Sequence, residues 1–295
     1  MTYRECYRIG STDLQKAGVP DWETDARYLL EFVCGTDRNT LLAHGDMPVL
    51  KKMQEQYFNL IEKRKKRIPL QLLTGKQNFC GLDFIVNEHV LIPRGDTEIL
   101  VEAALKIIKP GMRILDMCTG SGCILISILA MTEGVRGTGA DSSGEALRVA
   151  GENGRWLLQK DKRPDWILSD LFSAFLQNRD KGSEEQFCKY DMIVSNPPYI
   201  SSDVIDTLMP EVRDFEPRQA LDGSDDGLMF YRKIIKESIW FLNENGYLLF
   251  EIGYDQGRAV SEMMEAAGFA DIKVIKDYAG LDRVVTGRIN EVKDV

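Results

Sequence analysis

From about residue 96 to its end, the chain alternates short apolar runs with stretches of helical periodicity, and this alternation constrains the fold more than any other feature. A helix is expected over about 96–108, and the Gly120-Ser121-Gly122 loop opens another. Strands are expected near residues 113–116, 135–139, 166–168, 192–194, 247–252, 272–276 and 283–288. Short strands separated by helices predict an α/β fold with a parallel, doubly wound sheet.

The first 75 residues have a different pattern, which is helical throughout. Asp21 can cap a helix whose apolar residues recur at i, i+3, i+4 and i+7, and Gly35 can end it. A second helical pattern runs from residue 49 to about 67. Since no catalytic constellation lies here, this region is interpreted as a small helical bundle that binds or positions something.

Between the two regions, the apolar runs 84–86 and 90–92 predict a β-hairpin that turns at Asn87-Glu88-His89. The chain is therefore expected to comprise a helical domain (1–75), a hairpin linker (76–95) and an α/β domain (96–295). A length of 295 residues agrees with roughly two domains.

Composition excludes several classes of function. No stretch approaches the ~20 apolar residues of a membrane span, and the N-terminus lacks the apolar core of a signal peptide, so a cytoplasmic location is expected. Six scattered cysteines without a CxxC pair indicate reduced thiols. With only two histidines in addition, no metal site is expected.

The net charge of −9 disfavours wrapping of a nucleic-acid backbone. One basic run, residues 63–67, ends the second predicted helix. A solvated helix end favoured by the macrodipole is the preferred interpretation. A patch that touches RNA or an acidic partner is the alternative.

The loop after the first strand of the α/β region has the glycines that allow close backbone approach to a ligand. Its candidate ligand-binding residues are Asp116, Cys118, Thr119, Gly120, Ser121 and Gly122. Asp141 follows the next strand, at the spacing of a carboxylate that accepts hydrogen bonds from ribose hydroxyls. Both features also occur in enzymes that bind NAD, so alone they indicate only a nucleoside-type ligand.

Two details disfavour a dinucleotide. Leu125 stands where the third glycine of the dinucleotide fingerprint would be, and Asp116 would oppose a pyrophosphate. Asp116 suits the ammonium group of S-adenosylmethionine (AdoMet) instead. After the third strand, Asp170 could accept from an adenine amine, with Leu171 or Phe172 on the ring; alternatively, Asp170 is a helix N-cap.

A stiff loop, Asn196-Pro197-Pro198-Tyr199, follows the apolar run 192–194. The prolines fix φ and cannot donate, and Asn196 before a proline is pushed toward an extended conformation. The loop presents an amide, free carbonyls and an aromatic face, which suit a planar group bearing NH2. By itself the motif could equally be a rigid turn with a capping asparagine.

These motifs occur in the order found in class I AdoMet-dependent methyltransferases that act on amide or amino nitrogen. Residues 91–98 (LIPRGDTE) and 216–228 (EPRQALDGSDDGL) resemble two segments of the release-factor glutamine methyltransferases, the PrmC or HemK family. The resemblance covers essentially the whole chain. Departures from the pattern are Gly95 for a proline, Cys118 for a glycine, which restricts φ, and the altered pair Ser224-Asp225.

The resemblance implies an N-terminal helical bundle, a hairpin linker and a seven-stranded, Rossmann-like methyltransferase domain. It also implies transfer of methyl from AdoMet, leaving S-adenosylhomocysteine, to the glutamine of the Gly-Gly-Gln motif in class-1 peptide chain release factors. Cofactor contacts carried over are residues 118–122, Asp141, Leu171 and Asn196. The loop 196–199 is implied to hold the substrate glutamine, with Asn196, Pro197 and Tyr199 as catalytic residues.

Four charged residues of the flanking segments, Arg94, Glu98, Glu216 and Arg218, either touch substrate or brace the site; bracing is favoured, because Arg/Glu pairs in loops more often fix structure. A ribosomal-protein glutamine methyltransferase and a nucleic-acid adenine methyltransferase that flips its base are the alternatives. The acidic chain offers no basic groove for the latter, so no direct nucleic-acid substrate is expected, and the protein is expected to be a monomer without membrane partners.

Overall fold

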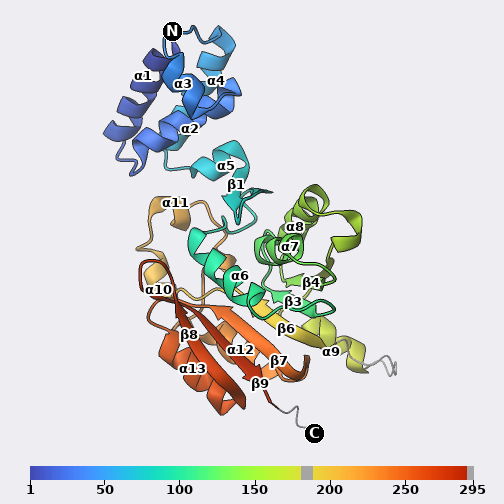
Figure 1. The fold of residues 1–295 in the computed structure, drawn as a ribbon. Coiled ribbons are helices and arrows are strands. Elements are labelled where there is room, and N and C mark those ends of the chain that lie inside the picture. The colour runs from blue at the N-terminus through green and yellow to red at the C-terminus, as the bar shows by residue number, and fades with distance from the viewer. Residues whose placement is uncertain (181–188, 291–295) are drawn as a thin grey trace. The chain divides into compact units, whose positions relative to one another are not determined.

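The computed structural model describes residues 1–180 and 189–290 (Figure 1). The chain divides into two compact units. One comprises Met1–Lys76 together with Met209–Phe215, and the other comprises Gln77–Leu208 and Glu216–Val295. Residues 209–215, which the sequence analysis places in the α/β region, thus cluster with the helical unit. Among the described residues, no helix has both the length and the apolar character needed to cross a membrane.

The helical unit is built around three long helices that contact one another. Its elements are α1 (Tyr3–Lys16), α2 (Trp22–Cys34), α3 (Arg38–Ala43), α4 (Lys51–Lys65), α5 (Leu70–Thr74) and α11 (Pro210–Arg213). The Thr2 side chain caps α1 in a capping box with Glu5, and Gly35 ends α2 in a left-handed conformation, as expected. Asp21 precedes α2 but forms no side-chain cap. Leu29, Tyr57 and other fully buried apolar side chains form the core.

The basic run at the end of α4 is only partly solvated: Lys63 and Lys66 are exposed, as the preferred interpretation expected, but the two arginines make internal ion pairs. Arg64 is buried: its Nε donates to Asp25 at 2.7 Å and its Nη2 donates to Glu211 at 2.9 Å. Arg67 also donates to both oxygens of Glu211, at 2.5 and 2.6 Å. Carboxylates distant in sequence therefore neutralise two of the five basic side chains inside this unit.

The predicted hairpin lies elsewhere in the sequence. Strands β1 (Lys76–Phe79) and β2 (Leu82–Ile85) pair across a two-residue turn, whereas residues 90–92 form no strand. Cys80 (φ 50°) and Gly81 (φ 77°) form that turn, and positive φ at both positions is the requirement of a tight hairpin turn. Val90 is instead buried with side chains of α8 (Gly144–Leu157).

All seven predicted strands of the α/β region are present in one sheet. They are β3 (Arg113–Met117), β4 (Arg136–Asp141), β5 (Asp165–Leu168), β6 (Tyr190–Ser195), β7 (Leu242–Glu251), β8 (Phe269–Lys276) and β9 (Asp282–Ile289), in the order β5-β4-β3-β6-β7-β9-β8. The pairs from β5 to β7 are parallel, but β9 is antiparallel to both of its neighbours. A wholly parallel sheet was therefore wrong at this edge, because the short connection from β8 to β9 only permits a hairpin.

Helices cover both faces of the sheet (Figure 1). One apolar cluster joins α6 (Glu98–Leu105) and α7 (Cys123–Met131) to Ile114 and Val194, and a second joins α12 (Met229–Ser238) and α13 (Gly257–Ala266) to Leu115 and Ile193. Adjacent strand residues alternate between the two clusters, as the pleat of a strand requires. The remaining elements are η1 (Gly95–Thr97), η2 (Lys160–Lys162), α9 (Ser173–Asp180), α10 (Ser202–Ile205) and η3 (Arg218–Ala220).

Candidate active site

The register of β3 and β6 brings two predicted loops to one edge of the sheet. Met117 pairs with Ser195 at the carboxyl ends of these parallel strands, and Ser195 Oγ donates to the Met117 carbonyl at 2.6 Å. The strand order reverses here, because β4 and β5 extend to one side of β3 and β6 lies on the other. The glycine loop and residues 196–199 therefore begin at the switch point, where open α/β sheets bind ligands.

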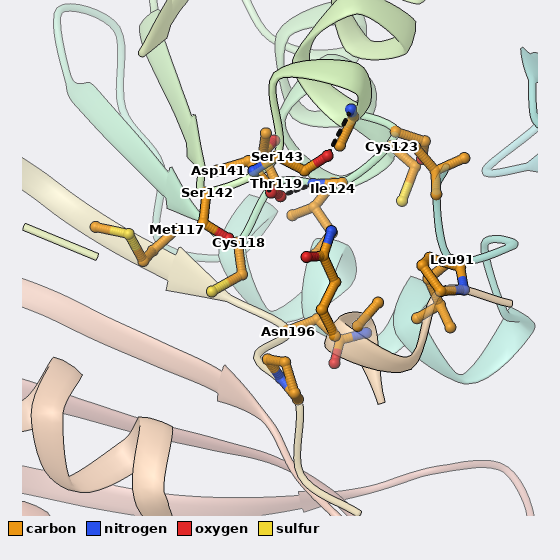
Figure 2. A pocket seen from close by; sticks show the side chains of 18 of the residues that line it. Leu91, Met117, Cys118, Thr119, Cys123, Ile124, Asp141, Ser142, Ser143 and Asn196 are labelled. Carbon is orange, nitrogen blue, oxygen red and sulfur yellow. Dashed lines mark hydrogen bonds between the residues drawn. The ribbon is translucent and has the colours of Figure 1, made fainter. Parts of the chain in front are cut away.

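A pocket at this edge collects most of the predicted site residues (Figure 2). Those that line it are Cys118, Thr119, Gly120, Ser121, Asp141, Asp170, Leu171, Asn196 and Pro198. Four others, Asp116, Gly122, Pro197 and Tyr199, lie next to these in the chain but outside the lining. Segments far apart in sequence thus converge on one pocket.

The glycine loop adopts left-handed backbone conformations at Cys118 (φ 61°), Gly120 (φ 56°) and Gly122 (φ 79°). At Gly122 an added Cβ would lie 2.9 Å from both Ile126 and Trp166, so glycine is required there for space as well as for conformation. Cys118 adopts the conformation while carrying a Cβ, which costs on the order of 1–2 kcal/mol. The departure from glycine noted in the sequence therefore falls on a position that favours glycine.

Asp141 holds the glycine loop in place. Its two carboxylate oxygens accept from the backbone N–H groups of Gly120 and Ser143, each at 2.9 Å. Burial raises the pKa of this carboxyl above its usual value, and these hydrogen bonds oppose the rise. Each oxygen has a second lone pair, so Asp141 can still accept from hydroxyl groups of a ligand in the pocket.

Asp116, at the start of the same loop, is completely buried. Its Oδ2 accepts from the Thr119 hydroxyl at 2.5 Å, but its Oδ1 has no hydrogen-bond partner among the described residues. Burial raises the pKa of this carboxyl to about 7. An unpaired buried acceptor of this kind opposes a pyrophosphate and suits a cationic group, although Asp116 itself does not line the pocket.

Of the three residues after β5 that were considered for adenine binding, two line the pocket. Asp170 and Leu171 line the pocket, and Leu171 has a positive φ of 47°. Phe172 instead lies in the core, where its ring stacks on Phe241 with centroids 4.7 Å apart. Of the two apolar side chains considered for an adenine ring, Leu171 is the one that reaches the pocket.

The loop 196–199 is braced from behind by the segment 216–228. The Ile200 N–H donates to Leu221, and the Gly223 N–H donates back to Ile200. A Cβ on Gly227 would lie 2.3 Å from the Tyr199 carbonyl, and one on Gly223 would lie 2.8 Å from Tyr199 Cα. The two sequence segments are therefore parts of one structure, in which the glycines permit backbone contact.

The four charged residues of the flanking segments mostly make internal contacts. Arg94 Nη2 donates to the buried Glu216 at 2.6 Å, and Glu98 accepts from the Cys80 N–H at 2.7 Å. Arg218 is exposed and pairs with Asp222 at 3.4 Å. Arg94 also lines the pocket, so it is the member of this set with access to a ligand there.

Two polar residues beside the loop 196–199 were not selected from the sequence as site residues. Thr97 Oγ1 accepts from Asn196 Nδ2 at 3.4 Å, and Glu251 Oε1 accepts from the Tyr199 hydroxyl at 3.3 Å. Glu251 ends β7, so a carboxylate at the carboxyl end of a buried strand was an available signal. Thr97 lies within the quoted segment 91–98 but was given no role.

Comparison with known proteins identifies relatives over nearly the whole chain. The model of the PrmC N-terminal domain matches residues 5–75. A release factor glutamine methyltransferase from Clostridium botulinum is 40% identical over 93% of this chain and 95% of its own length. One from Caulobacter vibrioides is 37% identical over 99% and 98%. The chain belongs to the release factor glutamine methyltransferase family.

A solved structure of a methyltransferase from Pyrococcus furiosus aligns with a TM-score of 0.51 at 14% identity. The alignment covers 72% of this chain and 90% of that one. At this identity the likeness concerns the fold alone, and it agrees with the seven-stranded sheet and flanking helices of the α/β unit.

Proposed function

We propose that this protein transfers a methyl group from AdoMet to the side-chain amide nitrogen of the glutamine in the Gly-Gly-Gln motif of class-1 peptide chain release factors. The observation that carries the proposal is the convergence of the loop 196–199 and the glycine loop on one pocket at the switch point. Relatives of nearly the same length that bear the release factor methyltransferase name support it.

The chain's own residues account for cofactor binding. The unpartnered Asp116 carboxylate favours the ammonium group, Asp141 accepts from ribose hydroxyls, and Asp170 with Leu171 receives the adenine. Residues 118–122 allow close approach of their backbone. The cofactor supplies an already activated methyl group on a sulfonium, so the protein needs to position the nucleophile more than to form a covalent intermediate.

The acceptor nitrogen is a poor nucleophile, because its lone pair is delocalised into the carbonyl. The Asn196 side-chain oxygen and the Pro197 carbonyl accept its two N–H bonds, which orients the lone pair and stabilises the charge that develops on nitrogen. Pro198 stiffens the loop, and the Tyr199 ring packs on the amide plane. Methyl transfer leaves S-adenosylhomocysteine as a neutral thioether and first gives an amide nitrogen that carries the methyl group, two protons and a positive charge. No base is required, since this cation is strongly acidic and loses one proton to water to give the neutral N-methyl amide.

The helical unit, residues 1–75, is proposed to recognise the release factor. Its contacts described above are structural and include no catalytic constellation, and a three-residue motif is too small to select one protein among many. The protein is further proposed to act as a monomer. A translation factor as substrate supports a cytoplasmic location and a protein acceptor, without a direct nucleic-acid substrate.

The test is Asn196→Ala, assayed by mass spectrometry of tryptic peptides from release factor incubated with AdoMet. Loss of a transition-state hydrogen-bond partner is expected to lower kcat by roughly 10²–10³-fold or more, while AdoMet affinity stays within about tenfold. Asn290→Ala, at an exposed position after β9 and outside the pocket, is the matched control and should keep full activity. Normal single-turnover methylation by the Asn196 variant would refute the role of this loop. Faster methylation of DNA than of release factor would refute the choice of substrate.

A further inference from the structure

The tyrosine of the loop 196–199 is fixed by two contacts, one to its side chain and one to its backbone. The Tyr199 hydroxyl donates to Glu251 Oε1 at 3.3 Å, and the Tyr199 carbonyl accepts from Gln256 Nε2 at 3.0 Å. Glu251 is the last residue of β7, and Gln256 is the residue before α13. The connection between these two elements therefore holds both ends of Tyr199.

The Gln256 side chain has a fixed orientation, because both of its polar groups have partners. Its Oε1 accepts from the Gly253 N–H at 2.9 Å and lies 3.3 Å from the Tyr231 hydroxyl. An amide oxygen only accepts and an amide NH2 only donates, so these contacts turn the NH2 toward Tyr199. The NH2 also donates to the Gly227 carbonyl at 3.4 Å. In this orientation a single amide group bonds two carbonyls from different segments.

The two carbonyls lie close together around this NH2. A Cβ on Gly227 would lie 2.3 Å from the Tyr199 carbonyl oxygen and 2.8 Å from Gln256 Nε2, so no side chain fits there. Both carbonyl oxygens carry partial negative charge, and the NH2 between them offsets their repulsion. Without the NH2, the Tyr199 carbonyl would lose this donor, which is costly for a polar group away from water. The end of the loop would then shift to find another partner.

Gln256 does not act on a ligand directly, because neither it nor Glu251 lines the pocket. Asn196 and Pro198, from the same loop as Tyr199, do line it. A change in the path of the loop would therefore reach the pocket through these residues and through the Tyr199 ring. Misplacement of reacting groups by about 1 Å can lower a rate roughly 10²-fold, so a small shift of the loop is sufficient to affect turnover.

We propose that Gln256 is a positioning residue that, together with the Glu251 contact, holds the Tyr199 ring at the angle at which it packs on the acceptor amide. The inference rests on the proposed function, because the contact between ring and amide belongs to that proposal. It assigns a role in turnover to a residue that lies outside both the loop 196–199 and the pocket.

The experiment compares Gln256→Met with Gln256→Glu. Methionine has a similar length but no donor, and glutamate keeps an acceptor for the Gly253 N–H while replacing the NH2 with an oxygen. Both variants should lower kcat for release factor roughly tenfold or more. The AdoMet dissociation constant and the KM for release factor should each stay within about threefold, because only the transition-state geometry is disturbed. Gln159→Met, at an exposed position before η2, is the control and should keep the wild-type kcat.

A double variant tests whether Gln256 acts through Tyr199. Tyr199→Ala removes the ring that Gln256 is proposed to position, so adding Gln256→Met to it should lower the single-turnover rate by less than about threefold more. Independent, additive losses in the double variant would overturn the inference, because Gln256 would then act by another route.

A Gln256→Met enzyme with wild-type kcat would also overturn the inference. So would an equal loss of kcat and AdoMet affinity, or the failure of both Gln256 variants to fold, since Gln256 would then only stabilise the fold. These results leave the proposed function intact, because wild type would still methylate release factor and Asn196→Ala would not. A wild-type enzyme inactive on release factor would instead overturn the proposed function and this inference with it.

Discussion

Both units bury charged side chains, but the two sets differ in how many of their carboxylate oxygens are hydrogen-bonded. In the helical unit, Asp25, Arg64, Arg67 and Glu211 form a closed cluster in which both arginines donate to carboxylate oxygens at 2.5–2.9 Å. In the α/β unit, Asp116, Glu216 and Glu251 each bury a carboxylate oxygen without a hydrogen-bond partner among the described residues. The first cluster is complete by itself, whereas the second set leaves acceptors open.

The difference separates a cluster that stabilises the fold from the unpaired carboxylate oxygens of Asp116 and Glu251, whereas Glu216 is also held by an ion pair with Arg94. Hydrogen bonds from Arg67 and Arg64 keep the pKa of Glu211 below its usual value in spite of burial, although burial raises the pKa of Asp25 in the same cluster. Burial instead raises the pKa values of Asp116 and Glu251 to about 7, without a cation bonded to either. Removing a charge from the first cluster should therefore reduce stability, and removing one from the second should mainly change binding or turnover.

Arg64→Ala is expected to have the largest effect on stability. It leaves the buried Asp25 without its partner, and breaking a buried ion pair in this way costs about 3–5 kcal/mol. Hydrogen exchange should become faster throughout Met1–Lys76. Calorimetric titration should show AdoMet affinity unchanged, because the residues that line the pocket belong to the other unit.

Arg67→Ala is the matched control for that experiment. The Arg67 side chain is more exposed, at 23% against 6% for Arg64, and Glu211 keeps its bond to Arg64 when Arg67 is removed. Its effect on hydrogen exchange should be clearly smaller. Equal effects of the two variants, or loss of AdoMet binding in Arg64→Ala, would contradict the distinction between the clusters.

Asp116→Asn tests the role of the unpaired carboxylate oxygens in the α/β unit. Loss of a charged acceptor should weaken AdoMet binding by about 1.5–3 kcal/mol, while the unfolding free energy is kept or increased. The raised pKa also sets the sign of the pH dependence of stability. In the folded apo protein the Asp116 carboxyl keeps its proton up to about pH 7, whereas in the unfolded chain it loses it near pH 4, so the free energy of unfolding falls as pH rises from about 4 to 7. The ammonium binds the ionised form, so AdoMet affinity should rise over the same range.

Isothermal titration at several pH values, with urea denaturation of the apo protein, measures both quantities. Asp203→Asn is the control, since Asp203 is exposed in α10 and does not line the pocket, so its substitution should leave AdoMet affinity unchanged. If Asp116→Asn kept the wild-type affinity, the open oxygen would not be the ammonium site. A loss of stability instead of affinity would place Asp116 with the structural charges.

Local patterns in the sequence were sufficient for the strands and for the loops that follow them. All seven strands of the sheet were predicted, most of them because they contain a short apolar run bounded by turn residues. The hairpin was misplaced, since its turn contains Cys80, which gives no usual turn signal. The direction of β9 was missed because parallel character was inferred from the other strands.

Contacts between distant segments could not be predicted in this way. The burial of Arg64 depends on Asp25 and on Glu211, which reaches the helical unit from another part of the chain. The approach of Thr97 and Glu251 to the loop 196–199 likewise depends on how η1 and β7 pack. Single-sequence patterns give the residues that a loop presents, but not the side chains that orient them.

Cys118→Gly should have the smallest effect. It tests whether the glycine loop of the pocket contains backbone strain in addition to the unpaired carboxylate oxygen of Asp116. Cys118 has φ 61°, a conformation that costs a residue with a Cβ on the order of 1–2 kcal/mol. Glycine removes this strain but loses roughly 0.5–1 kcal/mol through its greater freedom in the unfolded chain, so stability should rise by at most about 1 kcal/mol. Urea denaturation measures this, and Cys123→Ala, in the first turn of α7, is the control that should not stabilise. AdoMet affinity should stay within about threefold, because the loop keeps its path. A clear loss of stability in Cys118→Gly would mean that the cysteine side chain contributes more through packing than its backbone conformation costs.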